Sequence, residues 1–196
     1  MELLFSGPRR SRRGLFTLAW EQRKFSDIAT LSRGLTYSPA DIVTSNTGVR
    51  VLRSSNIAED QFVLHDDDVF VSEEAINIDF ASNGDILITA ANGSTRLVGK
   101  RGKINGLPGK TVPGGFMLLA KTNEPDFLNA SMGARWYSKF LDIGVSGGNG
   151  AIGNLDKEAL ANQELAVPNQ EERQRIGEYF ANIDHLITLH QRKRTT

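Results

Sequence analysis

The sequence predicts an α+β fold in which a domain of short, mixed strands precedes one long C-terminal helix of coiled-coil type. Short β-branched runs such as Ile86–Thr89 alternate with polar, glycine-rich loops, without a βαβ pattern or an internal repeat. After Pro168 the apolar residues change to helical spacing and keep it almost to the last residue. The predicted division is a basic, flexible segment over 1–19, a domain over 20–168 and a helix over 169–196.

Composition sets the broad class of the protein. The chain has 196 residues, and its 39% hydrophobic content supports a packed core. It contains no cysteine, which excludes a disulfide framework and a thiolate zinc site. No apolar run reaches the ~18 residues that a membrane-spanning helix needs. The first residues do not resemble a signal peptide, so we expect a cytoplasmic protein.

The first half of the domain is predicted to begin with a helix. Apolar residues recur at helical spacing over 21–34, and Gly34 is a plausible stop. A strand over 49–57 leads into a polar loop. Buried strands are expected at 86–89 and 116–120, and a hairpin or bulged strand is expected at 96–104.

The second half is predicted to be more helical. One helix is expected over 124–143, with large apolar residues on one side. A glycine-rich loop, one or two helical turns and the short strand 164–168 follow. The apolar side of the helix carries Phe127, Leu128, Met132, Trp136, Phe140 and Leu141.

The terminal helix carries clear start and stop signals. Asn169 can accept an N-cap hydrogen bond, and Glu172 stands three residues later, as in a capping box. Its apolar stripe needs a surface to cover it, because an isolated helix of this length is only marginally stable in water. The surface could be the chain's own domain or a second helix, and the second reading predicts that Ile183→Asp gives a monomer in sedimentation. The stripe comprises Ile176, Phe180, Ile183, Ile187 and His190 at spacings of 4, 3, 4 and 3, widened by Tyr179, Leu186 and Leu189.

Charge is distributed unevenly although the net charge is zero. Residues 54–95 contain nine acids and no Lys or Arg, whereas residues 96–123 contain six Lys or Arg and no acid. A zero sum can therefore conceal one positive face. The alternative is that both blocks are ordinary solvated surface.

The usual catalytic motifs are missing from the sequence. "HDDD" at 65–68 could suggest a metal site, but consecutive residues of an extended segment point in alternating directions. "SGGNGAIG" at 146–153 resembles a phosphate-binding loop only loosely, because the Lys-Ser/Thr of a P-loop is absent. We therefore expect no catalytic activity and no cofactor or metal, with a small enzyme that uses the 146–153 loop as an alternative.

Four segments in fixed order resemble the specificity subunit of type I restriction–modification systems. They are "AWEQRKFSDIATLSRG", "VRVLRSSNI", "NGDILIT" and "LANQELAVPNQEERQRIGEYFANIDHLI", which together span about residues 19–194. The last segment is the strongest signal, although it reads Glu171-Glu172-Arg173-Gln174 where the family usually has a plain Glu-Gln. A DNA-binding or adaptor module outside restriction systems remains an alternative, and a neighbouring methyltransferase gene would favour the first reading.

The resemblance implies a non-catalytic subunit that reads double-stranded DNA. Such subunits carry two target-recognition domains joined by an antiparallel coiled coil, and each domain reads one half of a bipartite site. They dock methyltransferase subunits, which use S-adenosylmethionine, and restriction subunits. This chain would supply one target-recognition domain and one spacer helix, and would act as a homodimer or with a second half-subunit.

Candidate DNA contacts follow from the polar loops and the basic run, since phosphate contacts give affinity and base contacts give specificity. Paired Ala substitutions at Lys100 and Arg101 should weaken binding and flatten its salt dependence. The phosphate candidates are Lys100, Arg101, Lys103, Lys110 and Arg135. The base candidates are Arg53, Ser54, Asn56, Asn92, Ser94, Thr95 and Arg96, with Tyr37 and Asn149 behind them.

Overall fold

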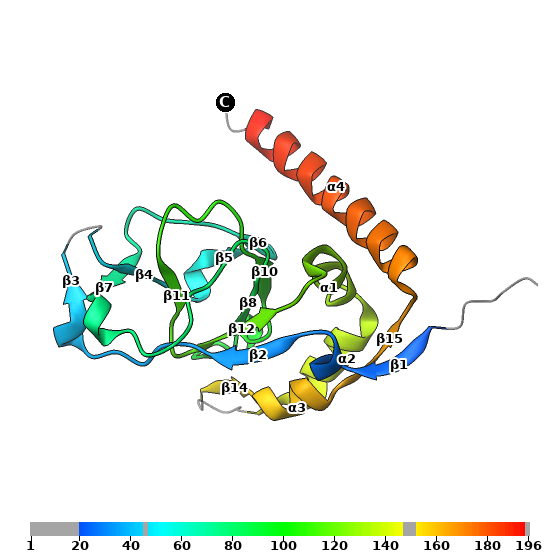
Figure 1. The fold of residues 1–196 in the computed structure, drawn as a ribbon, viewed down its shortest axis with the longest axis horizontal. Helices are drawn as coiled ribbons and strands as arrows, with labels where there is room; N and C mark the ends of the chain where they lie inside the picture. Colours follow the sequence, from blue (N-terminus) through cyan, green and yellow to red (C-terminus); the bar gives the residue numbers. More distant parts are fainter. Residues whose placement is uncertain (1–19, 45–46, 147–151, 195–196) are drawn as a thin grey trace, which may run out of the picture.

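A computed structural model describes residues 20–44, 47–146 and 152–194 of the chain. A body of short strands carries three helices on one part of its surface, and a fourth helix, α4, extends away from it (Figure 1). The predicted α+β class and the long terminal helix are therefore confirmed. The helices are α1 Pro125–Ser131, α2 Arg135–Gly144, α3 Lys157–Asn162 and α4 Gln170–Arg194.

The strands form several small sheets instead of one large sheet. One antiparallel sheet has the order β10-β8-β12-β2, and another four-stranded sheet has the order β11-β4-β7-β3, in which β11 and β4 run parallel. Smaller sheets are β13-β14-β9, β5-β6 and β1-β15. The strands are β1 Glu21–Lys24, β2 Thr30–Arg33, β3 Ile42–Val43, β4 Val49–Leu52, β5 Ile57–Ala58, β6 Gln61–Phe62, β7 Val69–Val71, β8 Ile86–Thr89, β9 Ala91–Asn92, β10 Arg101–Lys103, β11 Thr111–Pro113, β12 Met117–Lys121, β13 Val145–Ser146, β14 Gly153–Leu155 and β15 Glu164–Val167.

The core follows from the alternation of side chains along the central strands. Ile86, Ile88 and Leu118 face the side covered by α1 and α2, whereas Leu87 and Leu119 face a second cluster around Leu52 and Ile104. Strands β8 and β12 are thus buried on both faces, which explains their continuous apolar sequences.

The helix predicted over 21–34 is wrong. The segment forms β1, a short 3₁₀ turn at Phe25–Asp27, and β2. Strand β1 pairs with β15 near the end of the domain, and β2 pairs with β12. Phe25 and Ala29 are buried, as the spacing suggested. They lie in and beside a turn, however, and the backbone on either side of it pairs with distant strands.

Two further predictions need correction. The helix expected over 124–143 is two helices, because the chain turns at Gly133, whose N–H donates to the carbonyl oxygen of Ala130 at 2.9 Å. The buried strand expected at 116–120 begins one residue later, and Phe116 lies outside it with 67% of its surface exposed. Between the longer strands, residues 90–95 and 105–115 contain the short strands β9 and β11.

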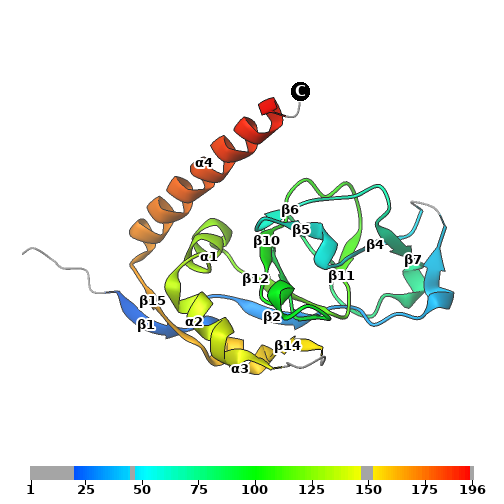
Figure 2. The same ribbon diagram turned by 180° about the vertical axis from the view of Figure 1, so that it is seen from behind.

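Helix α4 begins where the sequence predicts. The N–H of Glu172 donates to the Asn169 Oδ1 at 2.9 Å, which confirms the N-cap. The Glu172 carboxylate accepts a hydrogen bond from Trp20 Nε1 at 3.2 Å, so it links the helix start to the beginning of β1. Figure 2 shows α4 and β15 from behind, with β1 beside β15 at the base of the helix.

Candidate nucleic-acid interface

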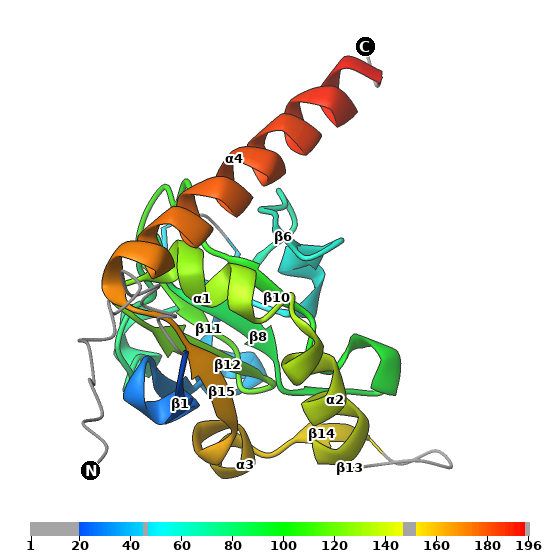
Figure 3. The same ribbon diagram turned by 90° about the vertical axis from the view of Figure 1, so that its right-hand side faces the viewer.

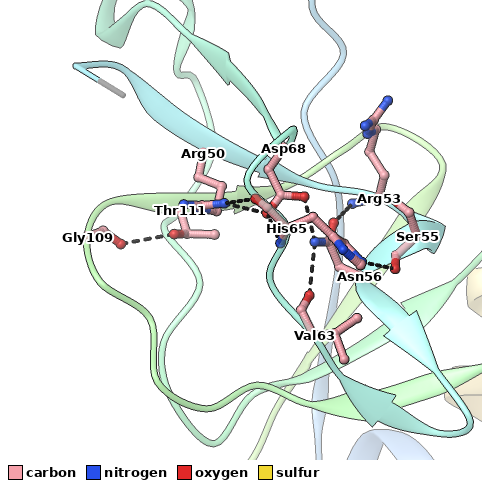
Figure 4. Close-up of polar contacts among 9 residues, drawn as sticks. All are labelled: Arg50, Arg53, Ser55, Asn56, Val63, His65, Asp68, Gly109 and Thr111. Carbon is pink, nitrogen blue, oxygen red and sulfur yellow. Dashed lines mark hydrogen bonds and ion pairs between the residues drawn. The ribbon is translucent and has the colours of Figure 1, made fainter. Parts of the chain in front are cut away.

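A buried polar network shapes the turn after β4 (Figure 4). Asn56 is completely buried, and its Oδ1 accepts a hydrogen bond from the Arg53 N–H at 2.7 Å. Its Nδ2 donates to the carbonyl oxygen of Val63 at 3.0 Å and to Asp68 Oδ1 at 2.8 Å. Because the side chain is used inside the protein, the prediction that Asn56 contacts a base is wrong, and its role is structural.

Asp68 stands at the centre of this network. It is buried, forms an ion pair with Arg50, and accepts a hydrogen bond from the His65 N–H at 3.1 Å. His65 Nε2 lies 3.0 Å from the carbonyl oxygen of Ser55. The "HDDD" segment is therefore a hydrogen-bonded turn, and no group of residues suited to hold a metal ion occurs in the described part of the chain.

The turn held by this network presents Arg53 and Ser54 to a groove of about 660 Å³. Asn92 Nδ2 donates to Ser54 Oγ at 3.1 Å, and Asn92 Oδ1 accepts from the Ser94 N–H at 2.9 Å, so two loops distant in sequence are joined here. The groove is lined by Leu35, Thr36, Tyr37, Pro39, Ile42, Leu52, Arg53, Ser54, Ala91, Asn92, Gly93, Gly114, Gly115, Phe116, Met117 and Ile152.

The groove brings together four of the predicted base-contact residues, Tyr37, Arg53, Ser54 and Asn92. The neighbouring 3₁₀ turn, Thr95–Leu97, carries exposed Thr95 and Arg96. Exposed Ser94 precedes that turn, and Asn149 lies outside the described residues. None of the described residues that line this groove is Asp or Glu, which suits a polyanionic ligand.

Sequence reasoning missed Phe116 and Ile152, which are 67% and 60% exposed and line the same groove. The sequence predicts a buried strand that includes Phe116, because Phe116 precedes an apolar run. The signal that could have placed it outside is the Gly114-Gly115 pair, which indicates a tight turn immediately before it. Nothing in the sequence around Ile152 indicates that it faces a groove.

Several cations of the basic run are paired with acids. Lys110 contacts Glu73 at 2.8 Å, Lys103 forms an ion pair with Asp126, and Lys121 lies 3.6 Å from Asp79. The acids that neutralise it come from other parts of the chain. Lys103 and Lys110 are thus already engaged with acids inside the protein, and their contacts with phosphate stay predictions.

Arg101 is also engaged within the protein. Its side chain is 12% exposed, and its Nη1 lies 3.5 Å from Asp60 Oδ2. Its guanidinium lies 5.8 Å from the centre of the Tyr137 ring. Burial raises the pKa of Tyr137, whose hydroxyl donates to the carbonyl oxygen of Gly99 at 2.8 Å. Arg101 is thus a structural residue of the α2 packing.

Four predicted contacts remain available as cations. In the described part of the chain, no side-chain ion pair is seen for Arg53, Arg96, Lys100 or Arg135. Arg96 and Arg135 are exposed, and Lys100 is half-buried. Their contacts with phosphate groups or bases stay predictions.

Helix α4 uses its two halves differently. Ile176 is partly buried against the domain's own core, so the chain itself covers this end of the predicted stripe. A Cβ added to Gly177 would lie 2.8 Å from the Phe127 N atom, which shows how closely the helix approaches α1. Arg173 Nε contacts Glu124 at 2.6 Å beside this junction.

Beyond this junction the apolar side chains of α4 are largely uncovered, and Figure 3 shows the helix continuing past the body. Ile183 is half-buried, and His190 is exposed. A hollow of about 450 Å³ lies between α4 and the body, and its lining includes Asp60, Asp126 and Asp184. The exposed apolar residues are Tyr179, Phe180, Leu186, Ile187 and Leu189.

Comparison with known proteins supports one family. A family model described as "Type I restriction modification DNA specificity domain" matches residues 18–196. Comparison with curated protein sequences gives no match. No helix in the described residues is long and apolar enough to cross a membrane.

Three solved structures share the fold. One comes from work on complex assembly and conformational transition of the type I R-M system, with a TM-score of 0.63, 14% identity, and coverage of 96% of this chain and 43% of the other. The HsdS subunit from Thermoanaerobacter tengcongensis has a TM-score of 0.61, 12% identity, and coverages of 95% and 42%. The type I restriction-modification S subunit from M. genitalium has a TM-score of 0.55, 12% identity, and coverages of 94% and 45%. The chain thus spans less than half the length of these structures.

Proposed function

Because this chain belongs to the family of type I restriction modification DNA specificity domains, we propose that it reads one half of a bipartite site in double-stranded DNA. The observation that carries the proposal is the acid-free groove that gathers Tyr37, Arg53, Ser54 and Asn92 from separate loops. Hydroxyl, amide and guanidinium groups on one concave surface are the groups that read base edges in the major groove.

The groove and the long helix occupy different parts of the molecule. Helix α4 lies on the opposite side of the body from β14, which pairs with β9 beside the groove (Figure 1). DNA bound in the groove would therefore leave the exposed face of α4 free. We propose that this face packs against a second helix, either in another copy of this chain or in a second half-subunit.

The remaining partners follow from the same proposal. We propose that the chain docks methyltransferase and restriction subunits in the cytoplasm and has no catalytic activity of its own. S-adenosylmethionine would then bind only the methyltransferase subunit. Copurification with a type I methyltransferase subunit tests this part, and its failure would not affect a test of DNA binding.

A steric block of the groove tests the DNA-binding proposal. Gly93 lines the groove, and a Cβ added there meets no atom within 4 Å, so Gly93→Leu should fold normally. We expect this change to reduce affinity at least tenfold for duplexes selected from a randomised library by the wild-type chain. Fluorescence anisotropy of labelled duplexes would measure the loss.

Gly109→Leu is the matched control for this experiment. A Cβ at Gly109 also meets no atom within 4 Å, but Gly109 does not line the groove. We expect this variant to bind like wild type. Equal binding by both variants would exclude the groove as the DNA-contacting surface.

A further inference from the structure

Phe116 is an exposed aromatic residue whose backbone is held firmly. Its carbonyl oxygen accepts hydrogen bonds from the N–H groups of Ala90 at 2.8 Å and Ala91 at 3.0 Å. The next residue, Met117, is 1% exposed and anchors the start of β12. The ring is therefore presented outward from a backbone position that the central sheet fixes.

The turn before Phe116 is equally constrained. The Gly114 N–H donates to the Leu52 carbonyl oxygen at 2.8 Å, and the Met117 N–H donates back to Gly114 at 2.8 Å. A Cβ added to Gly114 would lie 3.0 Å from the Leu52 carbonyl oxygen, so little room is left for the turn to shift. Such a turn positions one side chain without the entropy loss of ordering a loop on binding.

The surroundings of Phe116 combine apolar surface with hydrogen-bond donors. Ile152 and Ile42, which are 60% and 45% exposed, line the same groove. Arg53 and Ser54 contribute donors to it. Isolated exposed apolar residues are common on protein surfaces, but here three of them share one concavity that has no acidic side chain.

This combination matches one chemical feature of DNA. In the major groove, thymine presents an O4 acceptor beside an apolar C5-methyl group, and Phe is among the side chains that contact this methyl group. We propose that Phe116 is a specificity-determining residue that contacts the C5-methyl group of a thymine in the recognised half-site. This inference rests on the proposed function and adds a chemical identity to one recognised position.

Deoxyuridine substitution tests the proposal directly, because uracil lacks only the methyl group and keeps O4. Duplexes selected by the wild-type chain would be remade with each thymine replaced singly by deoxyuridine. We expect one position at which this replacement weakens binding about fourfold, the value for burial of one methyl group. Phe116→Ala should bind the thymine duplex correspondingly more weakly and lose its sensitivity to that replacement.

Two further variants make the result specific. Phe116→Leu retains an apolar side chain and should keep part of the discrimination between thymine and uracil. Ile143→Ala removes another exposed apolar side chain, 88% exposed on α2 and outside the groove, and should discriminate like wild type. Thermal unfolding of each variant would verify that the fold is unchanged.

The outcomes separate the two proposals. Binding to selected duplexes with no methyl-sensitive position, or with unchanged sensitivity in Phe116→Ala, would overturn the role of Phe116 and leave DNA binding standing. Failure of the wild-type chain, with and without its methyltransferase subunit, to bind any duplex above background would overturn the proposed function and this inference together.

Discussion

A single amide side chain, that of Asn56, joins the turn after β4 to the loop before β7. Its contacts with the Arg53 N–H, the Val63 carbonyl and Asp68 Oδ1 use the amide as both acceptor and donor. Each of these partners would lose one hydrogen bond if the amide were removed. Asn56 is buried, and its hydrogen bonds hold the turn that carries Arg53 and Ser54. It is therefore a positioning residue for these two side chains.

Asn56→Ala should lower the free energy of unfolding by roughly 2–4 kcal/mol, because it leaves buried polar groups unsatisfied. Urea denaturation would measure the change. Asn105→Ala is the control, since Asn105 is exposed and makes one long hydrogen bond of 3.3 Å to the Lys103 carbonyl. A loss for Asn56→Ala no larger than that for Asn105→Ala would contradict the assigned role.

Asp85 provides a pH-dependent prediction at the same scale. Its side chain accepts a hydrogen bond from the Ser82 N–H at 2.8 Å, but burial raises the pKa of its carboxyl above the ordinary value. The folded state thus holds the proton more tightly than the unfolded chain does. The ionised carboxylate destabilises the fold at neutral pH, and this penalty fades as the pH falls through the folded pKa.

Asp85→Asn keeps an acceptor for Ser82 and removes the titration. We expect the unfolding free energy of the variant, relative to wild type, to be highest at neutral pH and to decline as the pH approaches ~4, near the ordinary Asp pKa. Urea denaturation at several pH values measures this trend. If the difference in unfolding free energy between the variant and wild type stays constant with pH, burial does not raise the pKa of Asp85.

At the scale of elements, α4 is divided between two tasks. Its first turns belong to the domain through the Asn169 cap, Ile176 and the close approach at Gly177. Its later turns expose Leu186 and other apolar side chains. Ile183→Asp would change both the stability of the domain and the association of the helix, because Ile183 is half-buried.

Leu186→Asp separates them. Leu186 is 64% exposed, so a charge there should abolish helix-mediated self-association without lowering thermal stability of the domain. Analytical ultracentrifugation and thermal unfolding would measure the two effects. Ile176→Asp should instead lower the thermal stability of the domain, because it places a charge against the core that Ile176 partly covers. A wild-type sedimentation profile for Leu186→Asp would argue against the intermolecular helix pair.

At the scale of the whole molecule, electrostatics limits how the chain can bind DNA. The net charge is zero, and Arg101, Lys103 and Lys110 are paired with acids from elsewhere in the chain. These three cations are therefore already partly neutralised within the protein. Binding should therefore depend only moderately on salt, with much of the selectivity supplied by the groove.

The paired substitution of Lys100 and Arg101 should consequently be divided into two single changes. We expect Lys100→Ala to reduce the slope of log affinity against log salt by about 0.9, the value for one lost phosphate contact. Arg101→Ala should mainly reduce stability, because it removes the contacts with Asp60 and the Tyr137 ring. Binding titrations at several salt concentrations and thermal unfolding would measure both effects. If Arg101 contacts phosphate, Arg101→Ala should instead reduce the salt slope and leave stability unchanged.

The sequence by itself determined the elements that local chemistry specifies. The Asn169 cap, the start of α4, and the apolar strands β8, β12 and β15 could all be predicted, because caps and continuous apolar runs act over a few residues. The family resemblance likewise rested on ordered local motifs. None of these depends on knowing which distant segments meet.

Only the tertiary structure decided which residues face one another. Residues 21–34, expected to be a helix, form two strands because β1 pairs with β15 and β2 pairs with β12. Phe116 lies in a groove with Arg53 and Asn92. The tertiary structure also brought distant acids to the basic run and the first turns of α4 onto α1. Partners separated by tens to more than a hundred residues make these contacts, and a local pattern carries no information about such partners because their energies depend on the assembled fold.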